Sequence, residues 1–125
     1  VSLKFIKFFL TFNLILGFNI SNASWINFDG AQFNALDKIT ARIKKLEIYL
    51  NEEQVLDSLT IILKSCQNRP PDFLPESAAY VEIYDNLNQT FKDNNLIFSG
   101  WMFSSSPAIS ALEHPVYDIS LISCK

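Results

Sequence analysis

The stretch that decides the fold is AAYVEIYD, residues 78–85. Small or branched apolar side chains stand at positions 79, 81 and 83, with Tyr80, Glu82 and Tyr84 on the alternate positions. Strict alternation over a run of this length is typical of a β-strand with one buried face. We therefore expect a strand here whose second face carries two tyrosines and a carboxylate.

Segments of the same kind lie on both sides of this strand. SLTIILKSCQ (58–67) precedes it, and LIFSGWMF (96–103) and VYDISLISC (116–124) follow it. All three are rich in β-branched or aromatic residues. A proline-rich loop at 68–77 and a polar turn at 86–95 separate them. Short strands divided by turns predict an all-β fold, a small single-domain sandwich or barrel.

The segment LDKITARIKKLEIYL, residues 36–50, is ambiguous. Its apolar residues alternate but slip by one position at Lys44–Lys45. Such a slip suits a strand with a bulge, or a tight turn between two strands, although the spacing also approximates that of a helix. The β-branched residues favour strands. Residues 24–34 show no firm period, so we expect a linker or docked arm there and an all-β domain over residues 35–125.

One short helical turn is expected near residues 107–113. Ser106 is a suitable helix cap and Pro107 suits the first helical position. Pro115 disfavours helix at the residue before it, which ends the turn.

The N-terminal segment has the composition of an export signal. Lys4 and Lys7 precede an apolar run, Phe8 to Phe18, and a small residue stands two positions before Ala23. We expect a signal-peptide helix over residues 1–23, cleavage near Ala23, and a periplasmic or exported mature protein that contacts the membrane only through this segment before cleavage. An uncleaved anchor is the alternative, although the run is shorter than the ~20 residues that a spanning helix requires.

The mature chain is acidic. Without Lys4 and Lys7, eight of the ten basic residues remain against thirteen acidic ones, which gives a net charge of −5. An acidic surface repels phosphate backbones, so we expect no nucleic-acid partner.

Cys66 and Cys124 are the two cysteines of the chain. In an exported protein an even count predicts a disulfide bond, and two buried free thiols are the alternative.

The residues that could carry catalysis form no specific set. Ser104, Ser105 or Ser106 could be combined with His114 and Asp118, but the chain lacks a G-x-S-x-G nucleophile elbow. The carboxylates that could act in a glycosidase are scattered at expected strand ends: Glu82, Asp85, Glu113 and Asp118. His114 has no metal-ligating neighbour at close spacing. We expect no enzymatic activity, cofactor or metal.

Aromatic residues are the better indication of function. We take Trp101, Phe103 and Tyr117, together with His114, as candidate binding residues. With Tyr80 and Tyr84 among them, the aromatic residues are either part of the core or an exposed groove for a peptide or glycan, and Trp and Tyr side chains contribute strongly to binding at interfaces.

Four segments together resemble a family of exported alphaproteobacterial proteins of unknown function, numbered two-one-five-five. They are LDKITARI (36–43), CQNRPP (66–71), AAYVEIYD (78–85) and FSGWMFSSSPAISALEHPVYDISLISC (98–124). The family pattern has alanine where Ser104 stands and asparagine where Ser110 stands. The resemblance implies an exported one-domain protein with two matching cysteines and brings no known activity. It also implies a partner near a respiratory complex.

Taken together, the sequence favours a non-enzymatic binding or assembly module of an envelope or respiratory complex, with a protein partner in the cell envelope. The alternative is a small hydrolase, or a glycan-binding or glycan-acting protein, that uses His114 with Glu113 or Asp118.

Overall fold

The computed structural model describes residues 24–86, 95–107 and 112–125, and within these ranges the chain forms strands and no helix. The strands are β1 (Ile26–Phe28), β2 (Gly30–Asp37), β3 (Arg42–Tyr49), β4 (Glu53–Leu56), β5 (Leu59–Asn68), β6 (Ser77–Asp85), β7 (Leu96–Phe103), β8 (Leu112–Glu113) and β9 (Tyr117–Cys124). The predicted all-β fold is confirmed.

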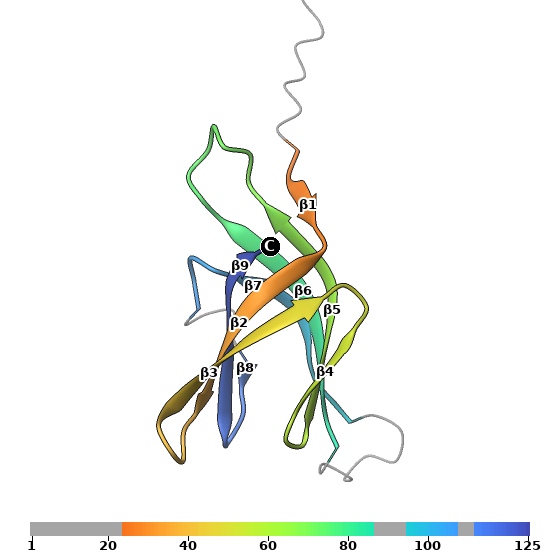
Figure 1. Cartoon of the computed structure of the whole chain (residues 1–125), viewed down its shortest axis with the longest axis vertical. Coiled ribbons are helices and arrows are strands. Elements are labelled where there is room, and N and C mark those ends of the chain that lie inside the picture. Colours follow the sequence, from red (N-terminus) through yellow and green to blue (C-terminus); the bar gives the residue numbers. More distant parts are fainter. Residues whose placement is uncertain (1–23, 87–94, 108–111) are drawn as a thin grey trace, which may run out of the picture.

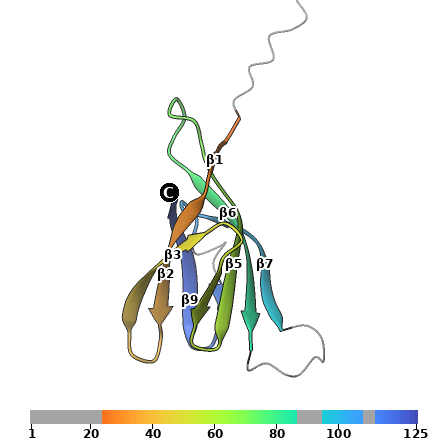
Figure 2. The ribbon, with the colours of Figure 1, turned by 45° about the vertical axis from the view of Figure 1, so that its right-hand side comes forward.

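Two antiparallel sheets pack face to face (Figure 1, Figure 2). Sheet A has the order β1-β5-β6-β7, and β4 also pairs with β5. Sheet B has the order β3-β2-β9-β8. Strands β5, β6 and β7 of sheet A contact β9 of sheet B, so the core lies between these strands.

The core consists of the inward side chains of alternate strand positions. Phe33 and Ile119 from sheet B, and Ile61, Val81 and Met102 from sheet A, all have an exposed fraction of 0%. Since successive side chains on a strand point to opposite faces, the neighbours of each inward residue along its strand point to the outer face of the sheet. The decisive strand β6 follows this rule, because Ala79, Val81 and Ile83 face the core.

The ambiguous segment 36–50 forms the last two residues of β2 and all of β3, joined by a turn. The turn lies at residues 38–41, before the phase slip, because the Asp37 carboxylate accepts hydrogen bonds from the backbone N–H groups of Ile39 (2.9 Å) and Thr40 (3.2 Å). Both hydrogen bonds lower the pKa of Asp37, and the bond from Thr40 has the larger effect. The strands favoured for this segment are present, but neither the bulge nor the turn offered at Lys44–Lys45 is, since β3 runs through both lysines without a register shift and leaves Ile43 exposed.

Residues 24–34 are an integral part of both sheets. β1 pairs with the end of β5, and β2 pairs with both β3 and β9. Ala31 and Phe33 are fully buried, so this segment supplies core side chains and is not a linker. β2 buries the alternate positions Ala31, Phe33 and Ala35, but two of these three side chains are alanines, so the alternation is weak in the sequence.

The helical turn expected near residues 107–113 is wrong at its C-terminal end. Leu112 and Glu113 form β8, which pairs with Ile119 and Asp118 of β9. Leu112 is buried, and the backbone N–H of His114 donates to the carbonyl of Tyr117 (2.8 Å), which closes a strand-to-strand turn around Pro115. Residues 108–111 lie outside the described residues, as does the expected signal segment 1–23. Within the part of the chain that the structure describes, no helix is long and apolar enough to cross a membrane.

Candidate functional site

The outward side of β6 and β7 gathers aromatic side chains. The register places Tyr80 opposite Trp101, and Ala78 opposite Phe103. Their outward direction follows from strand alternation, because the intervening positions are buried in the core. We call Tyr80, Ser99, Trp101 and Phe103 the β7 face.

The side chains of the β7 face are held in place but remain open to solvent. Tyr80 and Trp101 meet edge to face, with ring centroids 5.4 Å apart, and the Tyr80 hydroxyl lies 3.0 Å from the hydroxyl of Ser99. Trp101 is nevertheless 43% exposed and Phe103 is 38% exposed. These are large aromatic surfaces that the fold itself does not cover, in an arrangement that suits an interface.

The strand that carries this face has no charged residue along its whole length. β7 has the sequence LIFSGWMF, and in the described part of the chain it stands at the end of sheet A and pairs with β6. β3, one of the two outermost strands of sheet B, differs because it carries Arg42, Lys44, Lys45 and Glu47. Charges on an outermost strand discourage pairing with other proteins. β3 has that protection and β7 lacks it.

A hollow lies further along the outward side of sheet A. Its volume is about 490 Å³, and it is lined by Glu53, Thr60, Ile62, Tyr84, Asn86 and Asn95. The Tyr84 hydroxyl donates to Glu82 (2.9 Å), and this hydrogen bond raises the pKa of Tyr84. The amide of Asn86 donates to the hydroxyl of Thr60 (3.2 Å). An aromatic ring beside several amide and hydroxyl groups can contact the apolar face and the hydroxyls of a sugar.

His114 lies between the sheets, at the far end of β6 from Tyr80. Its Nε2 atom is 2.9 Å from a carboxylate oxygen of Asp85, and its Nδ1 atom accepts a hydrogen bond from the backbone N–H of Val116 (3.1 Å). Nδ1 is therefore the unprotonated nitrogen and Nε2 donates to the carboxylate. Both ring nitrogens are engaged within the fold, so neither is available to take a proton from a substrate. This arrangement favours a structural role for the imidazole.

The other members of the possible Ser–His–Asp set do not join His114. Asp118 pairs with Lys38 at 3.0 Å, and His114 pairs with Asp85 instead of Asp118. Tyr117 is a core residue at 7% exposure, and its hydroxyl donates to Asp57. The structure thus places Trp101 and Phe103 on the same side of β7. Tyr117 and His114 lie elsewhere, where their rings stack with centroids 6.3 Å apart.

The serines after β7 bind Glu76, which sequence analysis did not single out. The side chains of Ser104 (3.0 Å) and Ser105 donate to its carboxylate, and so do the backbone N–H groups of Ser77 (3.0 Å) and Ser105 (3.1 Å). Partial burial raises the pKa of Glu76, but the hydrogen bonds from Ser105, Ser104 and Ser77 outweigh it, so the pKa lies below its usual value. These serines fasten the loop that precedes β6. The contact between Glu76 and these serines is long-range in the sequence, and no local pattern predicts it.

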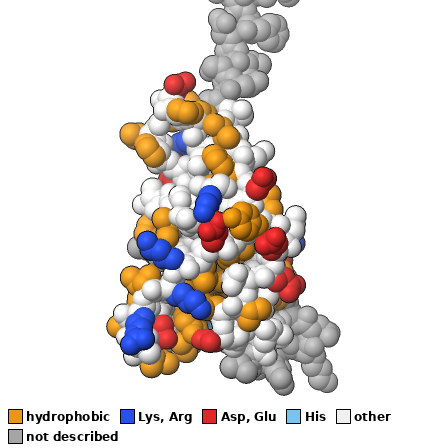
Figure 3. Space-filling model, viewed as in Figure 1, with side chains coloured by type: hydrophobic (Ala, Val, Ile, Leu, Met, Phe, Trp, Pro, Cys, Tyr) orange, Lys and Arg blue, Asp and Glu red, His pale blue; other side chains and the backbone are white. Residues whose placement is uncertain are grey.

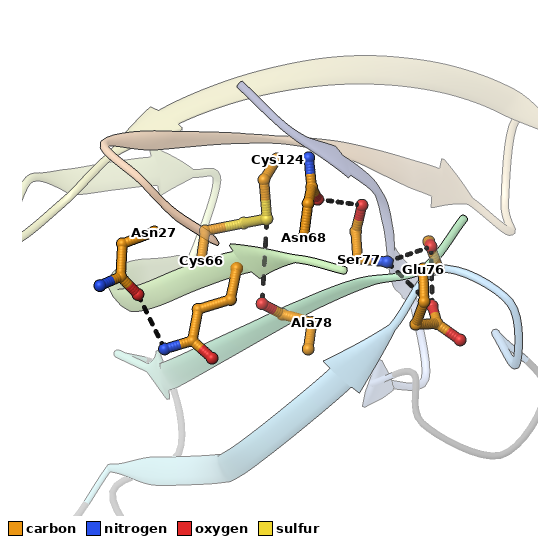
Figure 4. Close-up of a disulfide and its surroundings, with 9 residues drawn as sticks. Asn27, Cys66, Asn68, Glu76, Ser77, Ala78 and Cys124 are labelled. Atoms are coloured by element: carbon orange, nitrogen blue, oxygen red, sulfur yellow. Dashed lines mark hydrogen bonds between the residues drawn. A yellow bond between two sulfur atoms is a disulfide. The ribbon is translucent and has the colours of Figure 1, made fainter. Parts of the chain in front are cut away.

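The predicted disulfide joins Cys66 of β5 to Cys124 of β9, and so ties sheet A to sheet B (Figure 4). The two cysteines are 1% and 8% exposed. Beside the bridge, the hydroxyl of Ser77 donates to the Asn68 side chain (2.6 Å), which joins the facing ends of β5 and β6 (Figure 4). The Cys66–Cys124 disulfide holds the C-terminal end of the chain against the middle of the domain.

Among the described residues, no group of three or more His, Cys, Asp or Glu side chains is arranged to hold a metal ion.

The described geometry defines a disulfide-tied β-sandwich with an aromatic outer face, and comparison with known proteins gives its class. Residues 31–124 match the family described as "Uncharacterized protein conserved in bacteria (DUF2155)". The chain belongs to this family, which confirms the resemblance drawn from the sequence. The chain is also similar to the uncharacterized protein RP359 of Rickettsia prowazekii (strain Madrid E), with 30% identity over 106 residues, covering 85% of this chain and 67% of that protein. No solved structure matches.

Proposed function

We propose that this protein is a periplasmic, non-enzymatic binding or assembly module that recognises a protein partner in the cell envelope through its β7 face. The observation that carries the proposal is the pair of exposed aromatic side chains, Trp101 and Phe103, on a strand without charge. Interfaces are enriched in aromatic residues and depleted of charge at their centre. The family resemblance implies a respiratory or other envelope complex. We therefore expect the partner to belong to such a complex.

The structure supplies a rigid support for this face. Tyr80 packs against Trp101 from the neighbouring strand, and the Cys66–Cys124 bond fixes the two sheets against each other. Because the aromatic side chains are already held in position, binding a partner costs little ordering of this surface.

Substitution of Trp101 tests the proposal. The full chain is expressed with an affinity tag in its native envelope, crosslinked in the cell and recovered, and its partners are identified. Trp101→Ala is expected to reduce recovery of a specific partner about thirtyfold, the change that a contact worth about 2 kcal/mol produces. Ile43→Ala is the matched control, because Ile43 is an exposed apolar residue (64%) on an outermost strand of sheet B. Equal recovery by the two folded variants would contradict the proposal.

Glycan binding is a second candidate, and the hollow beside Tyr84 favours it. The hollow combines an aromatic ring with the amides of Asn86 and Asn95 and the hydroxyl of Thr60. Titration of the protein with cell-wall glycan fragments tests this candidate. A change in protein fluorescence that Tyr84→Ala abolishes would support it, and an unchanged spectrum at millimolar glycan would reject it.

A further inference from the structure

A second hollow lies at one end of the molecule, where the β2–β3 hairpin of sheet B and the β4–β5 turn of sheet A come near each other (Figure 1, Figure 2). Its volume is about 420 Å³, within the range of about 300–1,000 Å³ that small-molecule sites occupy. We call this hollow the hairpin cavity. The lining includes Asp37, Arg42, Lys44, Leu56, Asp57 and Tyr117.

Basic side chains concentrate on the same hairpin, although the chain as a whole has a formal net charge of −3. Four basic residues lie between positions 38 and 45, and the rest of the described chain has three. The four are Lys38, Arg42, Lys44 and Lys45. Lys and Arg side chains gather on the β2–β3 side of the surface (Figure 3). The hairpin is therefore a local positive region on an acidic protein.

Two of these cations face into the hairpin cavity. The β2–β3 register pairs Lys44 with Ala35 and Arg42 with Asp37. Ala35 is 1% exposed and belongs to the core, and cross-strand partners share one face of a sheet. Arg42 and Lys44 therefore extend the inner face of sheet B beyond the core. Lys45 is the next residue along β3, so it points to the outer face.

The charged groups of the cavity differ in how far the fold satisfies them. Asp37 accepts hydrogen bonds from two backbone N–H groups, and Asp57 accepts one from the hydroxyl of Tyr117. Of the ion pairs between described residues, none includes Arg42 or Lys44. The two carboxylates are thus stabilised from within the protein, and the two cations can take up an anion from outside.

The cavity also has an apolar lining. Leu56 is 5% exposed and Tyr117 is 7% exposed, and both side chains belong to the core. A predominantly apolar lining with a few convergent polar groups is typical of a site for a small organic molecule. A ligand whose anionic group reaches the cations can lay an apolar body against these two side chains.

We propose that the hairpin cavity binds an organic carboxylate through Arg42 and Lys44, with the apolar body of the ligand against Tyr117. A guanidinium matches a carboxylate with two parallel hydrogen bonds, and the ammonium of Lys44 adds a second positive charge. A singly charged carboxylate is favoured over phosphate because two carboxylates of the chain line the same cavity and repel a doubly charged group more strongly. The site does not depend on the β7 face.

Titration of the isotope-labelled full chain, followed by nuclear magnetic resonance, tests the proposal. The probes are hexanoate, its uncharged analogue hexanamide, N-acetylleucine and inorganic phosphate. Hexanoate and hexanamide have nearly the same shape and differ in charge, and N-acetylleucine carries its carboxylate on a peptide-like body. Lys44→Met and Lys45→Met are matched variants, because each removes one lysine from β3, the first inside the cavity and the second on the outer face.

Hexanoate is expected to shift the amide signals of the cavity residues in a saturable way, and hexanamide to leave them unchanged. Lys44→Met should weaken hexanoate binding about tenfold through loss of a charge-assisted hydrogen bond, and Lys45→Met should change it by less than about twofold. Tighter binding of N-acetylleucine than of hexanoate would indicate a peptide C-terminus as the source of the carboxylate, and the reverse order would indicate a free acid.

Three results would overturn the proposal. The first is no saturable shift at the cavity residues with millimolar hexanoate, or an equal response to hexanamide. The second is equal weakening by the two lysine variants, which would indicate a general attraction of anions to the basic hairpin. The third is binding of inorganic phosphate at the same residues as tightly as hexanoate, which would contradict the choice of a carboxylate.

Discussion

Removal of the Cys66–Cys124 bond is the most quantitative test of the fold. The bond joins residues 58 positions apart in the sequence. On the chain-entropy treatment, closing a loop of this length destabilises the unfolded state by about 4 kcal/mol. The substitution Cys66→Ala with Cys124→Ala removes the closure and only two sulfur atoms from the core, so loss of the closure dominates. A domain of this size has a free energy of unfolding of about 5–15 kcal/mol, so the expected loss is a large share of it.

Urea unfolding measures this loss. With a denaturant slope of about 1–2 kcal/mol/M, a loss of about 4 kcal/mol lowers the urea midpoint by about 2–4 M. Fluorescence and far-UV circular dichroism should report the same transition in the oxidised protein, the reduced protein and the double-alanine variant. The variant provides the control for the reductant, because its midpoint should not respond to reduction. Coincident midpoints for oxidised and reduced protein, or labelling of both thiols in the native protein, would refute the reasoning.

Two further predictions concern polar contacts inside the fold. Glu76→Gln should lower the free energy of unfolding by about 1–2 kcal/mol at pH 7, because the amide replaces charged hydrogen bonds to Ser104 and Ser105. Since the folded state lowers the pKa of Glu76, its contribution is complete above the pKa of the unfolded chain and is lost as the pH falls through the folded pKa. Urea unfolding over a series of falling pH values should therefore show a difference between wild type and variant that is complete at pH 7 and shrinks as the pH falls below the usual range of a glutamate pKa, and a difference that stays constant throughout would contradict this origin. His114→Ala should cost about 2 kcal/mol through loss of the contacts with Asp85 and Val116, and leave partner recovery unchanged. Unchanged stability with loss of a cellular function would instead indicate a catalytic or binding role.

The main strands could be predicted because their signals are local. Alternation in 78–85 and the β-branched run in 58–67 depend only on each segment's own side chains, and the structure has β6 and β5 there. The direction of the β7 side chains was predictable for the same reason, since Met102 is buried while Trp101 and Phe103 are exposed.

The features that sequence reasoning missed depend on contacts between distant segments. The β2–β3 turn is set by the Asp37 carboxylate, and the sequence spacing of Ile39 in the turn and Ile43 in β3 resembled a buried period although both side chains are exposed. The pairing of His114 with Asp85 spans 29 residues, and a local reading offered Glu113 and Asp118 instead. Tyr117 could be placed in the core only once its strand was seen to face sheet A.

The central claim, that the β7 face binds a protein partner, is tested most directly by photo-crosslinking in the native cell. A photoreactive amino acid is placed at Phe103 in one full-length variant and at Ile43 in another, both at exposed positions on outermost strands. Irradiation is expected to give one discrete adduct from position 103, identifiable by mass spectrometry, and none from position 43. No adduct from position 103, or the same set of adducts from both positions, would contradict the account.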